Sequence, residues 1–418
     1  MWYNKVMRDS ASLKLAIEKT LVQPFEKISV VELVDLLIEF AYLMQASDIH
    51  IQPEEALVRI RMRVDGLLHD LFEKISVNKE IHPEIISRIK VLSGLRTDEH
   101  ATPQDGRFKV KIKDVGDIDI RVSVIPTYYG ENAILRVLAQ TQNFDLEHLG
   151  FSPKDLKKVQ IAMKKPYGMI LANGPTGSGK TTTLYTILRQ LNKPDVSIIT
   201  IEDPIEYSLA GTTQIQIHEQ TGLTFASGLR SILRQDPNII MVGEIRDQET
   251  ASIAVNAALT GHLVLSTLHT NDAATTFPRL LDMGVPPFLV ASTVNVAFGQ
   301  RLVRKLCDIC KVKRVLTPDE IKSVAEIIPE VAKGSTRTFY EAKGCAACGK
   351  MGYQGRIGVR EVIEVNEEIR QLVMNRGNAG QIKEAAIRNG MTTMIHEGIM
   401  RAAQGTTTIE EILRIIHE

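Results

Sequence analysis

One eight-residue segment, GPTGSGKT at residues 174–181, constrains this chain more than any other part of the sequence. It fits the phosphate-binding loop pattern G-x-x-x-x-G-K-[ST] at every fixed position. An apolar run at residues 169–172 precedes it, and a helical run follows at residues 182–191. Strand, glycine-rich loop and helix in this order predict a nucleoside triphosphate site in an α/β domain. The simpler alternative is a glycine-rich turn that binds nothing.

The residue types in this loop suit a chain of phosphates. Glycines let the backbone curl so that successive N–H groups point at phosphate oxygens, at the positive end of the helix dipole. We expect Lys180 to neutralise charge on the β- and γ-phosphates of ATP and the Thr181 hydroxyl to bind Mg²⁺. The predicted nucleotide-binding residues are Gly174, Pro175, Thr176, Gly177, Ser178, Gly179, Lys180, Thr181 and Thr182.

Short, almost wholly apolar runs recur after the loop, at residues 196–199, 239–242 and 263–266, with helical stretches between them. Strands that are apolar on both faces belong to a parallel sheet that helices cover on both sides. We therefore expect an α/β domain over residues 146–300.

The region before this domain has a different pattern. Residues 58–64 alternate apolar and basic side chains, and residues 108–112 and 118–122 alternate again on either side of Gly116. This period indicates half-buried strands, the last two forming an antiparallel hairpin. A solvated face is the default interpretation of their Arg- and Lys-rich sides. We expect an N-terminal α+β domain and linker over residues 1–145.

Carboxylates and histidines lie next to several of the core strands. Glu244 follows the run at 239–242, where it could orient or deprotonate the attacking water. Glu202 opens the acidic segment EDPIE after another core strand, at the sheet edge where α/β proteins bind ligands. His262 and His269 flank the strand at 263–267, and His269 has the better claim as a phosphate sensor. An acidic loop and ordinary packed histidines are the simpler alternatives.

All four cysteines lie in two Cys-x-x-Cys pairs, CDIC and CAAC. Two such pairs complete a closed tetrahedral Zn²⁺ site with no open coordination position, and a closed site is structural. A redox pair and inert thiols are the alternatives. The predicted zinc ligands are Cys307, Cys310, Cys345 and Cys348. They define an expected tetracysteine segment over residues 301–356, followed by a small helical C-terminal subdomain over residues 357–418.

The overall composition narrows the class of protein. A chain of 418 residues suffices for roughly two to four domains. Fifty basic residues balance fifty acidic ones, so no overall field draws the chain to nucleic acid or anionic lipid. We find neither an apolar run of bilayer length nor a signal peptide at the start. We expect a cytoplasmic protein whose membrane contact is peripheral and made through partners.

From about residue 46 to its C-terminus the chain resembles the GspE/PilB family of secretion and pilus-assembly ATPases. The resemblance rests on the P-loop together with several further segments, which are specific as a set. They are ASDIH (46–50), PQDGR (103–107), EDPIEY (202–207), TFASGLR (224–230), LRQDP (233–237), GEIRD (243–247), a histidine segment at 260–272, and GYQGR (352–356) after the second cysteine pair.

The resemblance implies a RecA-like ATPase domain joined to an N-terminal domain with a PAS-like sheet, assembled as a homohexamer. It implies hydrolysis of ATP to ADP and phosphate, coupled to mechanical work on an inner-membrane platform protein, with a cytoplasmic adaptor as a further partner. The neutral net charge and the absence of aromatic-basic clusters argue against direct contact with nucleic acid. Glu244 would be the catalytic glutamate and Glu202 a polar or Mg²⁺-associated residue. The arginines that would reach the nucleotide from outside the P-loop are Arg107, Arg121, Arg230 and Arg234.

Two features depart from the family pattern. Ala101 and Thr102 stand shortly before PQDGR, where family members often carry a basic residue. Longer relatives also carry a further N-terminal domain for docking, and this chain begins almost directly at the second domain.

Other functions remain open at this point. The tetracysteine segment resembles the assembly and secretion branch, because pilus-retraction ATPases lack it. The alternatives are a retraction or DNA-uptake ATPase of the same superfamily, a zinc-bearing nucleic-acid translocase, and a nucleotide-binding scaffold that does not hydrolyse.

Overall fold

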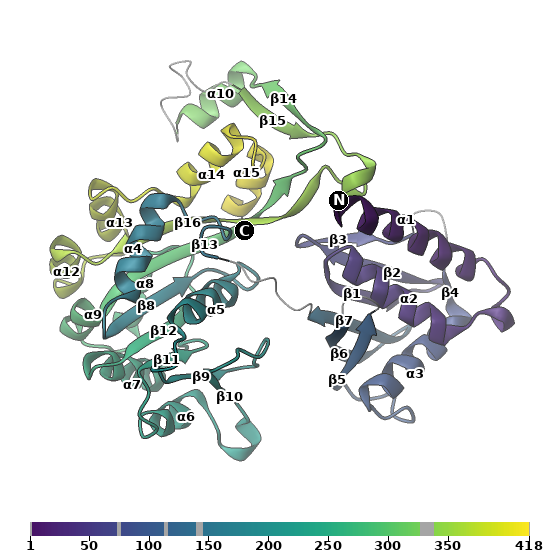
Figure 1. Cartoon of the computed structure of the whole chain (residues 1–418), viewed down its shortest axis with the longest axis horizontal. Helices are drawn as coiled ribbons and strands as arrows, with labels where there is room; N and C mark the ends of the chain where they lie inside the picture. The colour runs from purple at the N-terminus through teal and green to yellow at the C-terminus, as the bar shows by residue number, and fades with distance from the viewer. Residues whose placement is uncertain (1, 73–76, 113–115, 139–144, 327–337, 418) are drawn as a thin grey trace. The chain divides into compact units, whose positions relative to one another are not determined.

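A computed structural model describes residues 2–72, 77–112, 116–138, 145–326 and 338–417 (Figure 1). The chain divides into two compact units, Met1–Gln142 and Asn143–Glu418. Among the described residues, no helix combines the length and the apolar character needed to cross a membrane.

The N-terminal unit is an antiparallel sheet with helices packed against it. The strand order is β3-β2-β1-β7-β6-β5, and β4 pairs with β2. Helices α2 and α3 pack on this sheet, and α1 packs on α2. Helix α2 begins where the Ser29 side chain accepts a hydrogen bond from the Glu32 N–H, and it buries an apolar face that includes Leu33, Leu37 and Ile38.

The elements of this unit match the predicted pattern closely. The alternating run at 58–64 lies in β2, and the expected hairpin is the antiparallel pair β5–β6. The bounds are α1 Trp2–Leu21, α2 Val30–Leu43, β1 Ala46–Pro53, β2 Leu57–Val64, β3 Leu67–Asp70, β4 Val77–Asn78, α3 His82–Ser93, β5 Gln104–Ile112, β6 Gly116–Thr127 and β7 Gly130–Leu138.

The second unit is built on one large sheet of strand order β10-β9-β11-β12-β8-β13-β16. Neighbouring strands from β10 to β13 run parallel, and β16 is antiparallel to β13. One buried cluster joins the sheet to α4 and α5, and a second joins it to α6, α7, α9, α12 and α13. Helices thus cover both faces, which confirms the expected α/β architecture.

The bounds in this unit are α4 Pro153–Met163, β8 Gly168–Asn173, α5 Lys180–Leu191, β9 Ile198–Glu202, β10 Thr213–Gln216, α6 Phe225–Ile232, β11 Ile239–Val242, α7 Gln248–Leu259, β12 Leu263–Leu268, α8 Thr276–Asp282, α9 Pro287–Thr293, β13 Val294–Leu306 and β16 Tyr353–Glu364. Strand β9 lies further along the chain than the apolar run at 196–199 indicated. It continues through Thr200 to Glu202, two polar residues that are buried and hydrogen-bonded to each other.

Strands β13 and β16 extend beyond the rest of the sheet and carry the cysteine segment between them (Figure 1). This segment contains β14 Lys311–Val315, α10 Pro318–Ala325 and β15 Thr338–Ala342, and β14 pairs with β15. Four helices end the chain: α12 Glu367–Met374, α13 Ala379–Arg388, α14 Met394–Ala403 and α15 Ile409–His417. Strand β13 passes through residue 300 and β16 through residue 356, so the predicted ATPase domain, tetracysteine segment and C-terminal subdomain share one sheet. The predicted domain boundaries at these two residues stay a prediction.

Candidate functional site

The P-loop runs from the end of β8 to the first turn of α5 and has little room for side chains. Gly174, Gly177 and Gly179 have φ of 146°, 80° and 85°, in the region that favours glycine. A Cβ on Gly174 would lie 2.5 Å from the Gln300 carbonyl oxygen. Helix α5 has no side-chain N-cap, so its first N–H groups remain for a ligand.

Lys180 is held inside the loop that it is predicted to serve. Its Nζ donates to the carbonyl oxygens of Gly174 at 2.7 Å and Pro175 at 3.0 Å. Burial lowers the pKa of Lys180 to about 8, and the charge of Glu244 opposes this shift. A desolvated ammonium of this kind gains strongly from a bound phosphate.

Glu244 follows β11, and its carboxylate lies between the side chains of Arg246 and His269. Its Oε1 is 2.5 Å from Arg246 and its Oε2 is 3.1 Å from Nε2 of His269, which follows β12. Glu244 is only 8% exposed, and it lies at the same sheet edge as the P-loop, because β11, β12 and β8 are parallel neighbours. The structure therefore brings Lys180, Glu244 and His269 together. The role of each in catalysis stays a prediction.

Arg246 is a neighbour of Glu244 that the sequence analysis did not single out. Hydrogen bonding to Glu244 raises the pKa of its guanidinium. The sequence feature that could have indicated Arg246 is its position two residues after Glu244 in the GEIRD segment. His262, by contrast, is an ordinary structural residue, since its Nδ1 lies 2.9 Å from the carbonyl oxygen of Ala257.

Glu202 is the last residue of β9 and lies in a buried polar cluster. Its carboxylate accepts hydrogen bonds from Thr200 at 2.6 Å, from Gln214 at 3.2 Å and from the Tyr185 hydroxyl. Burial and the neighbouring Glu202 charge raise the pKa of Tyr185. These bonds tie α5 to β9 and β10. The predicted association of Glu202 with Mg²⁺ stays a prediction.

Arg230 and Arg234 lie on the exposed side of α6 and just beyond its end. Arg230 pairs with Glu249 at 2.5 Å. Arg234 donates to the Arg230 carbonyl oxygen at 2.9 Å and to the Ser231 hydroxyl at 3.2 Å. Both guanidiniums are thus engaged at the α6 surface, and their predicted contact with nucleotide stays a prediction.

Arg107 and Arg121 face each other across β5 and β6 in the N-terminal unit. The same line continues to Arg136 on β7, Asp48 on β1 and Arg63 on β2, each directly opposite the next. Because opposed residues share a face, these five form what we name the arginine row. Asp48 lies 3.1 Å from Arg136 and 3.5 Å from Arg63. Like charges directly opposite destabilise a sheet, so a row of four arginines with one carboxylate suits an anion.

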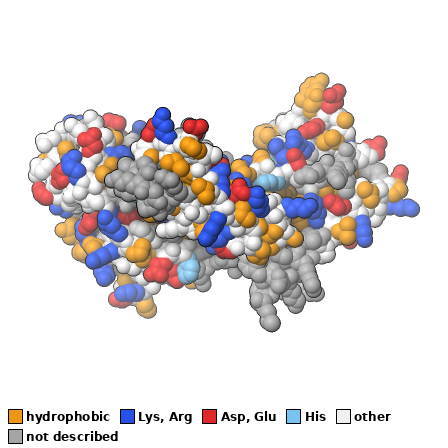
Figure 2. Space-filling view, turned by 90° about the horizontal axis from the view of Figure 1, so that it is seen from above, with side chains coloured by type: hydrophobic (Ala, Val, Ile, Leu, Met, Phe, Trp, Pro, Cys, Tyr) orange, Lys and Arg blue, Asp and Glu red, His pale blue; other side chains and the backbone are white. Residues whose placement is uncertain are grey.

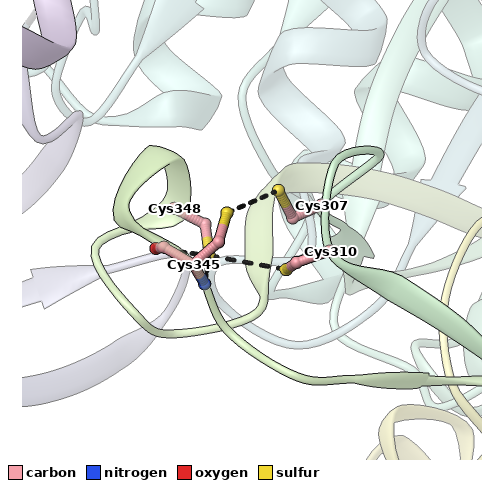
Figure 3. A group of neighbouring side chains, drawn as sticks. All are labelled: Cys307, Cys310, Cys345 and Cys348. Atoms are coloured by element: carbon pink, nitrogen blue, oxygen red, sulfur yellow. Dashed lines mark hydrogen bonds between the residues drawn. The ribbon is translucent and has the colours of Figure 1, made fainter.

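The two cysteine pairs meet where β13 ends and β16 begins (Figure 3). Their four sulfur atoms lie within 4.8 Å of one another, and all four thiols are free. The Sγ atoms are 3.9 Å apart for Cys307–Cys345, and 3.8 Å for Cys310–Cys348 and Cys345–Cys348. A tetrahedron with Zn–S bonds of about 2.3 Å has edges of about 3.8 Å, so the geometry fits a closed metal site.

The comparison with known families matches nearly the whole chain. The model "Type II/IV secretion system protein" matches residues 25–414. The chain is 45% identical over 385 residues to a type IV pilus assembly ATPase PilB of Myxococcus xanthus, covering 92% of this chain and 67% of that protein. It is 46% identical over 393 residues to a type II secretion system protein E of Xanthomonas campestris, covering 93% and 68%. The PilB of Thermus thermophilus is 44% identical, and only 41% of its length is matched.

Solved structures support the same fold. The Legionella pneumophila ATPase DotB superposes with a TM-score of 0.69 at 23% identity, covering 95% of this chain and 98% of that one. The pilus retraction motor PilT, solved with bound ADP, gives a TM-score of 0.61 at 27% identity, covering 91% and 96%. The resemblance inferred from the motifs is thus confirmed. The chain belongs to the type II/IV secretion system protein family, alongside ATPases of type IV pilus assembly and type II secretion.

Proposed function

We propose that this chain is the ATP-hydrolysing subunit of a cytoplasmic homohexameric motor that powers type IV pilus assembly or type II secretion. The observation that carries the proposal is the position of Glu244 at the same sheet edge as a P-loop with a buried lysine, in a chain about 45% identical to such ATPases. Its partners would be an inner-membrane platform protein and a cytoplasmic adaptor, with only peripheral membrane contact. In this proposal the second unit is a RecA-like ATPase domain and the N-terminal sheet is PAS-like.

The site residues divide the chemistry of hydrolysis among them. Lys180 and the first N–H groups of α5 hold the phosphates, and Glu244 accepts a hydrogen bond from the water that attacks the γ-phosphorus. His269 and Arg246 fix the Glu244 carboxylate through its two oxygens. The Thr181 hydroxyl would hold a Mg²⁺ ion, whose charge would neutralise the phosphates. The P–O bond to ADP breaks as the bond to the water oxygen forms, and Glu244 takes the proton that the water loses.

Two observations favour assembly or secretion over retraction. Identity is 45% and 46% to assembly and secretion proteins but 27% to the retraction motor PilT. The four-cysteine cluster, which resembles that branch, is also present. Direct action on nucleic acid is disfavoured, because basic and acidic side chains are interspersed over the described surface seen in Figure 2 and balance in the sequence.

Lys180→Ala tests nucleotide binding. The substitution removes a buried ammonium whose charge-assisted hydrogen bonds to phosphate contribute about 1.5–3 kcal/mol each. We expect ATP affinity to fall roughly 10- to 100-fold. Titration with a fluorescent ATP analogue measures the change, and Lys193→Ala, which removes an exposed lysine just after α5, is the control. Unchanged affinity in Lys180→Ala would reject the P-loop as the ATP site.

We infer that the cysteine cluster binds one structural Zn²⁺. Elemental analysis of the purified chain should find about one zinc per chain, because the four sulfurs form a closed tetrahedral set. Cys310→Ser should lose the metal and lower the melting temperature of the second unit. Ala346→Ser, an exposed change inside the second pair, is the matched control. A metal-free preparation with an unchanged melting temperature would remove the assignment.

A further inference from the structure

The side chain of Gln300, on β13, forms hydrogen bonds to the P-loop and to helix α5. Its Nε2 donates to the Ser178 carbonyl oxygen at 2.6 Å, and its Oε1 accepts from the Thr183 hydroxyl at 2.9 Å. Gln300 is 1% exposed. One amide thus holds both the loop and the first turns of α5.

The same amide oxygen also accepts a hydrogen bond from a fully buried arginine. Arg360 lies opposite Gln300 in the β13–β16 pair, and its Nε donates to Gln300 Oε1 at 2.9 Å. Burial lowers the pKa of Arg360 to about 9, so it stays charged at neutral pH. Its guanidinium stacks 4.3 Å from the Phe151 ring centroid. Position 358 must be glycine for this to fit, since a Cβ there would lie 2.4 Å from the guanidinium.

Beyond the P-loop, this arginine reaches the first described stretch of the second unit, residues 145–152, which we name the approach segment. Arg360 NH1 donates to the Leu149 carbonyl oxygen at 2.6 Å, and Arg401 donates to the Gly150 carbonyl oxygen. Glu397 joins the two arginines: its carboxylate accepts from the Arg360 backbone N–H and lies 2.7 Å from Arg401. Burial raises the pKa of Glu397.

We propose that Gln300 and Arg360 form a buried relay that couples nucleotide occupancy of the P-loop to the approach segment. The inference rests on the proposed ATPase function. In the structure Lys180 is bound to two carbonyl groups of the loop, and a bound phosphate must take it from them. The loop then shifts against Gln300, and Arg360 has to follow, because leaving a buried donor without its acceptor is unfavourable. The approach segment begins the unit that follows the N-terminal sheet in the chain. Arg360 is a positioning residue in this scheme.

Hydrogen exchange with and without ADP tests the relay. The amides of Leu149, Gly150 and Phe151 donate within the approach segment and report its opening. In the wild type, saturating ADP should slow their exchange on the order of tenfold, as local opening becomes costlier. Arg360→Met, which fills similar volume without the charge, should reduce this effect to less than about twofold. ADP affinity should change by no more than about threefold, because the variant keeps every phosphate ligand.

Arg304→Met is the matched control. Arg304 lies on β13, the strand that carries Gln300, and pairs with buried Glu411 at 2.8 Å. It should keep the full ADP effect on the approach segment. Arg360→Lys serves as a second variant, with the charge retained and the forked geometry lost, if the methionine variant does not fold. A wild type that binds ADP without any change in exchange at residues 149–151 overturns the relay and leaves the ATPase proposal intact. Retention of the full effect in Arg360→Met and Arg360→Lys also overturns it. A wild type that binds no ADP refutes the proposed function instead.

Discussion

Glu244→Gln is expected to lower ATP turnover by about two to three orders of magnitude while leaving ATP affinity within a few-fold of the wild type. The amide keeps the shape of the carboxylate and can still accept hydrogen bonds from Arg246. It loses the negative charge that orients and deprotonates the attacking water. The substitution therefore lowers kcat. Phosphate release under saturating ATP measures turnover, and binding of a fluorescent analogue measures affinity.

The control for this substitution is Glu384→Gln, which neutralises an exposed carboxylate on α13. It should turn over ATP at close to the wild-type rate. Hydrolysis by Glu244→Gln at the wild-type rate would show that the catalytic assignment is wrong. Glu202 would then be the first residue to test, although its carboxylate is already bonded to Thr200, Gln214 and Tyr185.

The parts of this site that are predictable from sequence are those in which neighbouring residues carry the signal. The P-loop contains its own glycines, lysine and threonine, and the helix that follows begins at Lys180. Glu244 and His269 each follow an apolar run, and parallel strands end at the same sheet edge, so their proximity could be anticipated. The cysteine cluster is likewise fixed by two local pairs.

The parts that sequence could not reveal depend on pairing between distant strands. Gln300 and Arg360 are 60 residues apart, and only the β13–β16 register places them opposite each other. A single arginine after GYQGRIGV gives no sign that it is fully buried. Strand β9 shows a related limit. A strand predicted from apolar residues alone stops before Glu202, which is polar. Glu202 can be buried because it bonds to polar side chains of α5 and β10, which lie elsewhere in the sequence.

The sequence indicated the basic strand faces that make up the arginine row, but not their alignment. Alternation indicated a basic face on each strand, and the default interpretation was a solvated one. The register of four successive pairings aligns Arg107, Arg121, Arg136 and Arg63 into a single line. Asp48 neutralises the end of the row that contains Arg136 and Arg63. Arg107 and Arg121 lie opposite each other at the other end of the row, and both match arginines that the family resemblance assigns to the nucleotide.

Arg107→Ala and Arg121→Ala are therefore expected to lower kcat by on the order of 10³ to 10⁵ if either arginine stabilises the transition state of phosphoryl transfer. ATP affinity should change little, since the P-loop supplies the ground-state contacts. The matched control is Lys109→Ala, which removes a cation two residues along β5 that stands opposite Asp119. If both arginine variants keep the wild-type kcat, the same substitution at Arg230 and Arg234 becomes the test of the remaining candidates.

Mixing two inactive variants then decides whether the arginine acts within one chain or between chains. Arg107→Ala carries an intact Glu244, and Glu244→Gln carries an intact arginine row. If an arginine completes the site of a neighbouring subunit, mixed rings contain some interfaces where an intact row meets an intact Glu244, and these should recover activity. Recovery should follow the statistics of mixing, with its maximum near equal amounts. No recovery in rings shown to be mixed would mean that the arginine serves the P-loop of its own chain.

The requirement for a ring has a separate test. Specific activity should fall on dilution, because a monomer has no neighbouring subunit to supply the arginine. Activity that is unchanged down to the monomer would reject that requirement, whichever arginine proves to be catalytic.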